Sequence, residues 1–111
     1  MAKVFSRLFT ETIDATNDTL YAVGANDILT IRKFTICNND SADRTVEIWL
    51  VPNGSSPDDT NKLIDNKNIP AGYTIVISEA EGHVLDGGGI IYAKASVGGV
   101  LTAHGSGIVD S

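Results

Sequence analysis

The stretch Ile28–Cys37, with the sequence ILTIRKFTIC, decides the fold class of this chain. Its apolar residues recur at every second position, first at Leu29 and Ile31 and then, on the opposite parity, from Phe34 onward. A period of two residues is typical of a β-strand that buries one face. A β-bulge inserts one extra residue and so resets the face to which the following side chains point. The stretch therefore predicts a long strand with a bulge at Arg32-Lys33.

The same period recurs along the rest of the chain, most clearly over 45–51, where Val46, Ile48 and Leu50 share one face. Strands are predicted at 3–9, 19–23, 28–37, 45–51, 63–69, 73–78, 90–96 and 100–109. Turn-forming residues separate them, and Gly98-Gly99 indicates a hairpin turn before the last strand. About seven or eight short strands with such turns favour an all-β fold. We expect an antiparallel β-sandwich, either a jelly roll or immunoglobulin-like.

Length and composition set the scale of this fold. The chain has 111 residues, of which 42% are hydrophobic and 20% charged, as in a folded domain. We expect residues 1–18 to form an N-terminal arm or strand with a linker, and residues 19–111 to form the sandwich. Cys37 is the only cysteine, which excludes a disulfide within the chain. Burial of apolar side chains and hydrogen bonding must therefore hold the fold together.

The charge balance limits the expected partners. There are 14 acidic and 8 basic residues, and the formal net charge is -6. Phosphate backbones and anionic membrane surfaces repel such a chain, so we expect neither nucleic acid nor a membrane as a partner. No apolar run approaches the roughly 20 residues of a transmembrane helix, and residues 1–7 lack the apolar core of a signal peptide. We therefore expect synthesis in the cytoplasm, without export.

The residues that carry chemistry in other proteins form no recognisable set here. His83, His104 and Cys37 are the only possible zinc ligands of their kinds, and they are far apart in sequence rather than at the short spacings of a zinc site. Cys37 has no nearby base or helix start that would activate a thiol, so packing is its expected role. The glycine-rich run 86–89 lacks the lysine of a phosphate loop. We expect no enzyme activity, cofactor or metal.

Trp49 is a candidate interface residue. It alternates with the apolar face of its strand and points to the other side together with Glu47. A tryptophan on an outer sheet face is typical of a protein–protein hot spot. Two other interpretations remain open: a local reversal of the alternation would place Trp49 in the core, and an exposed ring could stack on a sugar. The candidate residues on this face are therefore Glu47 and Trp49.

The N-terminal segment 1–9 is locally basic and apolar within an acidic chain. Its apolar residues occur in adjacent pairs, and the candidate interface residues among them are Val4, Phe5, Leu8 and Phe9. The segment could complete its own sheet as an edge strand, or it could reach to a neighbouring subunit and pair there by strand addition. The adjacent pairs favour the second use, because strict alternation is the pattern expected of an ordinary edge strand.

Several of these stretches resemble a family of small structural proteins of tailed bacteriophages. In chain order they are TLYAV at 19–23, IRKFTICNN at 31–39, VEIWLVP at 46–52, IPAGYTIVI at 69–77, IYAKAS at 91–96 and AHGSG at 103–107. The shared features are a strand that ends in Cys-Asn, a Pro-Ala-Gly turn and a glycine turn before the penultimate strand. The resemblance covers about residues 19–109.

The resemblance implies a non-enzymatic β-sandwich component of a virion. Within the virion, small size and acidity favour a decoration or cement protein on the capsid surface, which stabilises the head by binding at capsomer junctions. The expected partners are further copies of the chain, as a homotrimer or another ring, and the major capsid protein or another virion protein. The alternatives are a neck, tail or fibre-attachment component, and a carbohydrate- or receptor-binding module of a tail fibre. Synthesis would take place in the host cytoplasm.

Overall fold

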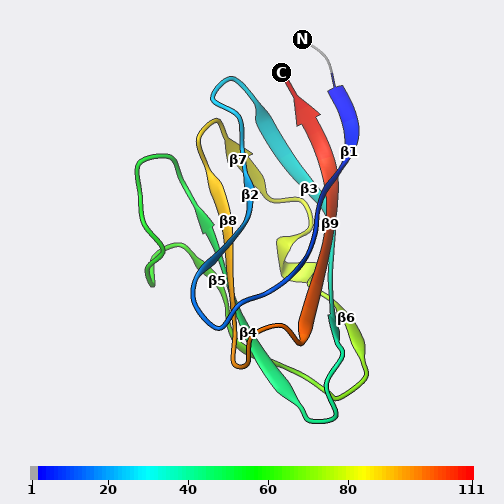
Figure 1. The fold of residues 1–111 in the computed structure, drawn as a ribbon. Helices are drawn as coiled ribbons and strands as arrows, with labels where there is room; N and C mark the ends of the chain where they lie inside the picture. The colour runs from blue at the N-terminus through cyan, green and yellow to red at the C-terminus, as the bar shows by residue number, and fades with distance from the viewer. Residues whose placement is uncertain (1–2) are drawn as a thin grey trace.

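The computed structural model describes residues 3–111, which form a sandwich of two antiparallel β-sheets (Figure 1). Over these residues the strands and one short 3₁₀ helix are β1 (Lys3–Thr12), β2 (Asp18–Ala22), β3 (Ile28–Asn38), β4 (Arg44–Val51), β5 (Lys62–Ile69), β6 (Thr74–Val76), η1 (Ser78–Ala80), β7 (Val84–Asp86), β8 (Ile90–Ala95) and β9 (Leu101–Asp110). The all-β sandwich predicted from the sequence is confirmed. The three-residue strand β7 was not predicted, because it is too short to show a period.

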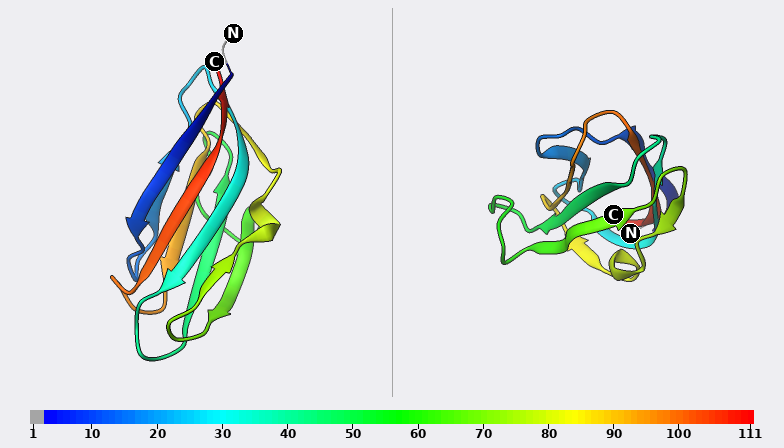
Figure 2. Two further views of the ribbon diagram at one scale, coloured as in Figure 1. Left: turned by 90° about the vertical axis from the view of Figure 1, so that its right-hand side faces the viewer. Right: turned by 90° about the horizontal axis from the view of Figure 1, so that it is seen from below.

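The strands pair around a hairpin formed by β4 and β5. Sheet A has the order β1-β9-β3-β6, with β7 also paired to β3, and sheet B has the order β2-β8-β4-β5. Outward from the hairpin, β3 pairs with β6 and β7, β2 with β8, and β1 with β9. This nested pairing across two sheets is that of a jelly roll, not of an immunoglobulin-like sandwich. Figure 2 shows β1, β9 and β3 side by side in one layer, with the start of β1 and the end of β9 at the same end of the sandwich.

One turn predicted from the sequence has a different role. The glycines at Gly98-Gly99 do not make a hairpin, because β8 belongs to sheet B and β9 to sheet A. The turn carries the chain from one sheet to the other, and Gly99 has a φ of 81° that favours glycine. Local sequence indicated the turn, but it did not indicate which strands the turn joins.

The bulge predicted in β3 is confirmed. The register of β3 against β9 shifts between Ile31 and Lys33, so Arg32 is the extra residue. The side chains of Ile31 and Phe34 are both fully buried on either side of the shift. A straight strand would have turned one of them to solvent, because successive side chains alternate between faces. The bulge therefore places two phases of the sequence in one core, and it leaves Arg32 and Lys33 exposed.

A second bulge lies across β9 from the first. The register of β1 against β9 shifts between Arg7 and Phe9. The buried Phe9 ring packs edge-on against Phe34, with 5.0 Å between ring centroids and an interplanar angle of 70°. A Cβ added at Gly105 would overlap the Phe9 ring, and one added at Gly107 would overlap the Thr30 carbonyl oxygen. The glycines of β9 therefore make room for both neighbouring strands.

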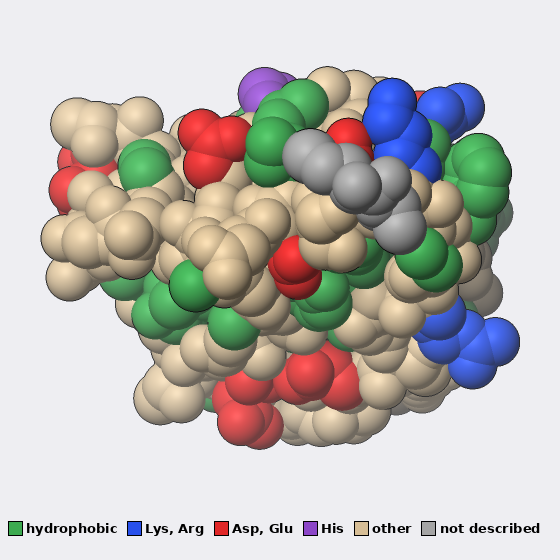
Figure 3. All heavy atoms as spheres, turned by 90° about the horizontal axis from the view of Figure 1, so that it is seen from above, with side chains coloured by type: hydrophobic (Ala, Val, Ile, Leu, Met, Phe, Trp, Pro, Cys, Tyr) green, Lys and Arg blue, Asp and Glu red, His purple; other side chains and the backbone are tan. Residues whose placement is uncertain are grey.

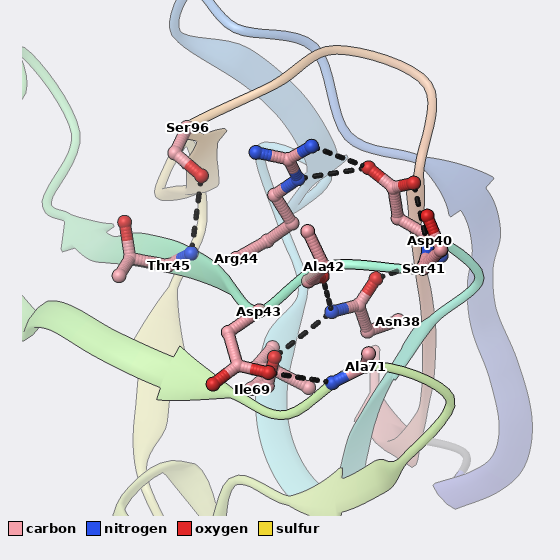
Figure 4. Close-up of polar contacts among 10 residues, drawn as sticks. All are labelled: Asn38, Asp40, Ser41, Ala42, Asp43, Arg44, Thr45, Ile69, Ala71 and Ser96. Carbon is pink, nitrogen blue, oxygen red and sulfur yellow. Dashed lines mark hydrogen bonds and ion pairs between the residues drawn. The ribbon is translucent and has the colours of Figure 1, made fainter.

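A buried asparagine fastens the turn that carries the chain from β3 in sheet A to β4 in sheet B (Figure 4). The Nδ2 of Asn38 donates to the carbonyl oxygens of Ala42, at 3.0 Å, and Ile69, at 2.9 Å. Its Oδ1 accepts a hydrogen bond from the Asp40 amide at 2.9 Å. Because a buried amide is stable only with such partners, Asn38 fixes the end of β3 to the end of β5 in the opposite sheet.

Charged groups continue this network at the surface (Figure 4). The Arg44 guanidinium donates to Asp40 Oδ2, with Nε at 2.8 Å and Nη2 at 2.7 Å. This hydrogen bond is the main reason that the pKa of Asp40 lies below its ordinary value. Asp43 Oδ1 accepts from the Ala71 amide at 3.0 Å. The connections at this end of the sandwich are thereby held by side chains as well as by strand pairing.

Candidate interaction surfaces

The N-terminal segment lies within the chain's own sheet. The strand β1 pairs with β9 from Lys3 to Thr12 and forms one edge of sheet A. Phe9 is buried in the core, and Leu8 is half-buried against it. Val4 and Phe5, by contrast, are 51% and 80% exposed. In the single chain the segment therefore completes its own sheet as an edge strand, which is the first of its two predicted uses. Of its four candidate interface residues, only Val4 and Phe5 are free to touch another molecule.

The second candidate, Trp49, is buried. It points away from the core cluster, as the alternation along β4 predicted, but it is only 6% exposed. Lys62 on β5 and Tyr92 on β8 are its cross-strand neighbours, and Lys62 Nζ lies 5.2 Å from the ring centroid. A lysine in this position covers the ring with its stem and makes a cation–π contact. The prediction that Trp49 is exposed is therefore wrong, because side chains of the neighbouring strands cover its ring.

The charges beside Trp49 are also paired. Glu47 is half-buried, with its Oε1 3.8 Å from Lys62 Nζ, and it lies opposite Lys94 in the register of β4 and β8. Lys62 Nζ also donates to Asp65 Oδ1 at 3.2 Å. The hydrogen bond to Asp65, with the attraction of Glu47, raises the pKa of Lys62. On this part of the outer face of sheet B, the aromatic ring is therefore covered and the charged groups are paired with one another.

The outer face of sheet A carries exposed apolar side chains. Phe5, Ile108, Thr30 and Val84 occupy facing positions across β1, β9, β3 and β7. Phe5 is 80% exposed and Val84 is 54% exposed. Ile28, two residues before Thr30 on β3, is 41% exposed and points to the same face. We call the four hydrophobic residues Phe5, Ile28, Val84 and Ile108 the apolar row.

Basic side chains lie beside the apolar row. Arg7, Ser106 and Lys33 face one another across β1, β9 and β3, and the bulge in β3 adds Arg32. We call Arg7, Arg32 and Lys33 the basic row. Lys33 Nζ lies 3.7 Å from Glu81 Oε2, whereas neither arginine of the row has an ion pair within residues 3–111. Seen from the end of the sandwich where β9 ends, Lys and Arg side chains gather on one side, with hydrophobic side chains among them (Figure 3).

Two shallow depressions flank Ser106 within this face. One has a volume of about 240 Å³ and is lined by Phe5, Ser6, Arg32, Ser106 and Gly107. The other has a volume of about 230 Å³ and is lined by Arg7, Phe9, Thr10, Lys33, Thr35, His104, Gly105 and Ser106. Both depressions join cationic side chains to hydroxyl groups, which suits side chains with carboxylate groups. This surface was not predicted from the sequence, although two consecutive basic residues at a predicted bulge were the local signal for it.

A wider cleft lies between the edges of the two sheets. It has a volume of about 580 Å³ and is bounded by the loop after β4, the start of β5 and the strand β7. Leu50, Leu63 and Leu85 give it apolar walls, while Asn53 and Asp86 add hydrogen-bonding groups. Its chemistry is that of a mixed surface without an aromatic platform.

The possible metal ligands do not form a site. His83 lines the cleft, His104 lies on the outer face of β9 with Nδ1 3.5 Å from Thr10 Oγ1, and Cys37 is half-buried on β3. Within residues 3–111, no group of three or more His, Cys, Asp or Glu side chains is placed to hold a metal ion.

Residues 3–111 contain no helix with the length and apolarity that a membrane span needs.

Comparison with known proteins gives a likeness in fold. No family model and no curated protein matches the sequence. A chain in the structure of infectious bursal disease virus, Gx strain, is similar with a TM-score of 0.50 and 14% identity, over 97% of this chain and 31% of that chain. A chain of the Gt strain gives a TM-score of 0.35 and 10% identity, over 96% of this chain and 30% of that chain. At this identity the likeness to the Gx chain shows a shared sandwich fold, and this chain spans less than a third of that viral chain.

Proposed function

We propose that this chain is a non-enzymatic structural protein of a virion and that it decorates the capsid surface as a cement protein. The observation that carries the proposal is the outer face of sheet A, where Phe5 and Val84 stay exposed beside an unpaired Arg7 and Arg32. Patches that combine exposed apolar groups with arginine are typical of protein–protein contacts. A cement protein stabilises a head through such contacts, because bound surface at subunit junctions adds to the free energy of disassembly.

Two further observations support this role. The jelly roll is a recurrent architecture of viral capsid proteins, although lectins and cupins share it. The chain is similar in fold to part of a chain of infectious bursal disease virus, and its sequence motifs resemble small virion proteins of tailed bacteriophages. We propose synthesis in the host cytoplasm and assembly with the major capsid protein or another virion protein.

The position in the virion separates this proposal from a neck, tail or fibre-attachment role. Quantitative gel densitometry of purified virions, with antibody-gold labelling, measures copy number and place. A cement protein should be present in hundreds of copies over the head. A dozen or fewer copies at one vertex would replace the cement role by the neck or tail role, and absence from virions would overturn both.

The cleft between β5 and β7 favours one different function, a carbohydrate- or receptor-binding module. Asn53 and Asp86 could bind hydroxyl groups there, while Leu63 would pack on an apolar ring face. The buried Trp49 removes the stacking platform that such a module would otherwise use. A glycan array with the purified protein tests this function. Binding that is lost in Asp86→Ala and kept in Asp14→Ala, an exposed aspartate outside the cleft, would support it over the cement role.

A further inference from the structure

We infer that the outer face of sheet A docks against an acidic surface of a different protein, and not against the same face of a second copy. This inference rests on the proposed function and gives the chemistry of its partner. It follows from the distribution of cations over the molecule, from the symmetry of self-contacts and from the apolar row.

The cations of this chain are unevenly distributed. Of the 8 basic residues, Lys3, Arg7, Arg32 and Lys33 belong to the outer face of sheet A. Elsewhere the cations face partners: Arg44 binds Asp40, Lys62 binds Glu47 and Asp65, Lys67 binds Glu79, and Lys94 lies opposite Glu47. On the outer face of sheet A, Lys3 lies opposite Asp110 and Lys33 lies near Glu81. Among residues 3–111 the two cations without a facing carboxylate, Arg7 and Arg32, are therefore both on this one face of a chain with net charge -6. Charge complementarity then selects a partner with carboxylate groups.

Symmetry argues against the same face of a second copy. A two-fold contact buries one patch against itself, so each residue meets either its own copy or a near neighbour from the same patch. A two-fold axis at the basic row would set it against a second basic row, with Glu81 near Lys33 to offset the repulsion. The other acids of this face, Asp86 and Asp110, lie opposite Ile28, at the end of the face away from the basic row. Like charges brought together in an interface oppose binding. A different, acidic surface avoids this repulsion and lets Arg7 and Arg32 form bidentate pairs with carboxylates.

The apolar row argues for a protein partner over a nucleic acid. Phe5 and Val84 lie next to the basic row on the same face. A folded acidic surface can cover them together with the arginines, and the burial adds to affinity. A phosphate backbone offers no apolar groups to cover them, and the acidic remainder of the chain repels it.

The test uses viral particles assembled without this protein, from a virus whose copy of the gene is deleted, and the purified full chain added back. The double variant Arg7→Glu/Arg32→Glu reverses the two unpaired cations. The matched control Lys67→Glu/Lys94→Glu makes the same change in net charge on residues of sheet B. Circular dichroism and thermal unfolding confirm that each variant is folded.

We expect the wild-type chain and the control to bind the particles, and Arg7→Glu/Arg32→Glu to bind at least about tenfold more weakly. Binding of the wild-type chain should fall as NaCl rises from 50 to 500 mM, because salt screens the pairs. Poly-L-glutamate should compete for the same face, and poly-L-lysine should not.

Each other outcome is decisive. If the wild-type chain does not bind the particles, the proposed function fails. If the wild-type chain and Arg7→Glu/Arg32→Glu bind equally well, the proposed function stands and this inference is wrong. A dimer in light scattering that the double variant abolishes would instead assign the face to a second copy. Binding of duplex DNA that only this variant loses would assign the face to nucleic acid.

Discussion

The two outer faces of the sandwich carry similar types of side chain, but those on sheet B are covered and those on sheet A are exposed. Each carries an aromatic residue beside basic side chains, Trp49 with Lys62 on sheet B and Phe5 with Arg7 and Arg32 on sheet A. On sheet B the aromatic ring is 6% exposed and the lysine is paired with carboxylates. On sheet A the aromatic ring is 80% exposed, and neither arginine has an ion pair within residues 3–111.

The difference comes from position within the sheets. Trp49 belongs to β4, an inner strand with β5 and β8 on either side, so neighbours exist to cover it. Phe5 belongs to β1, an edge strand with a neighbour on one side only. The same type of side chain is therefore structural on an inner strand and available for contact at an edge. Exposed apolar side chains at an edge indicate where another molecule is expected to bind.

The largest test of this comparison removes the covered ring. Trp49→Ala should reduce the free energy of unfolding by about 4 kcal/mol, because truncation of a buried aromatic side chain loses its burial and leaves a cavity. Urea denaturation measures this loss. The matched variant Phe5→Ala should change stability by no more than about 0.5 kcal/mol, as exposed positions do. Similar losses for the two variants would contradict the assignment of one ring to structure and the other to contact.

The next test removes the Asn38 hydrogen bonds that connect the two sheets. Asn38→Ala should cost about 3 kcal/mol, because it removes three hydrogen bonds and leaves the carbonyl oxygen of Ile69 without its buried partner. The neighbouring Asn39→Ala should cost less than about 1 kcal/mol, because the side chain of Asn39 makes its hydrogen bonds in solvent. Thermal unfolding of both variants compares them. An equal loss would mean that the turn depends on its sequence and not on the buried amide.

The sequence predicted what is local and missed what depends on strand neighbours. The bulge at Arg32-Lys33 was predictable, because a phase change in alternation lies within one strand. The side to which Trp49 points was predictable for the same reason. Its burial was not, because the cover comes from Lys62, whose position depends on how β5 pairs with β4.

Strand order lies beyond local patterns for the same physical reason. The residues of β1 find their partners in β9 at the other end of the chain, and only the folded pairing joins Phe5 to Ile108. Consequently, the apolar and basic rows could not be assembled from the sequence, although each member is visible in it. Gly98-Gly99 shows the same limit, since two glycines predict a turn but not the sheets that it connects.

A smaller effect is expected at Gly107 of β9, where sheet A has no space for a side chain. Gly107→Ala should cost about 2 kcal/mol, because the new Cβ would overlap the Thr30 carbonyl oxygen and push β3 away from β9. Gly98→Ala is the control, since its new Cβ would come no closer than 3.4 Å to the backbone of Ala15. Urea denaturation of the two variants should separate them. A Gly107→Ala variant as stable as the wild-type chain would show that the strands beside the bulge can shift freely.

The smallest expected effect concerns Glu11, on the same strand as Phe5 but opposite the buried Ala103 of β9. Burial raises the pKa of the Glu11 carboxyl, and the charges of Asp18 and then Asp14 add to the rise. The folded state therefore holds this proton more tightly than the unfolded chain does. Well below the ordinary glutamate pKa of about 4.3, the carboxyl is protonated in both states and makes no difference. As the pH rises past the unfolded and then the raised folded pKa, the free energy of unfolding decreases, because the ionised Glu11 carboxylate is less favourable in the folded state than in the unfolded chain.

Glu11→Gln removes that penalty, so it should be more stable than the wild-type chain at pH 7 and equal to it at pH 3. Glu79 provides the opposite case, because its own backbone amide and then Lys67 lower the pKa of its carboxyl. Its stabilising contribution is present at pH 7 and is lost as the pH falls through the lowered folded pKa, so Glu79→Gln should be slightly less stable than the wild-type chain at pH 7. Melting temperatures of the three proteins from pH 3 to pH 8 test both signs. A lower melting temperature for Glu11→Gln at pH 7 would mean that the charged carboxyl stabilises this edge of the sandwich, and that the acidic residues around it have a partner within the fold.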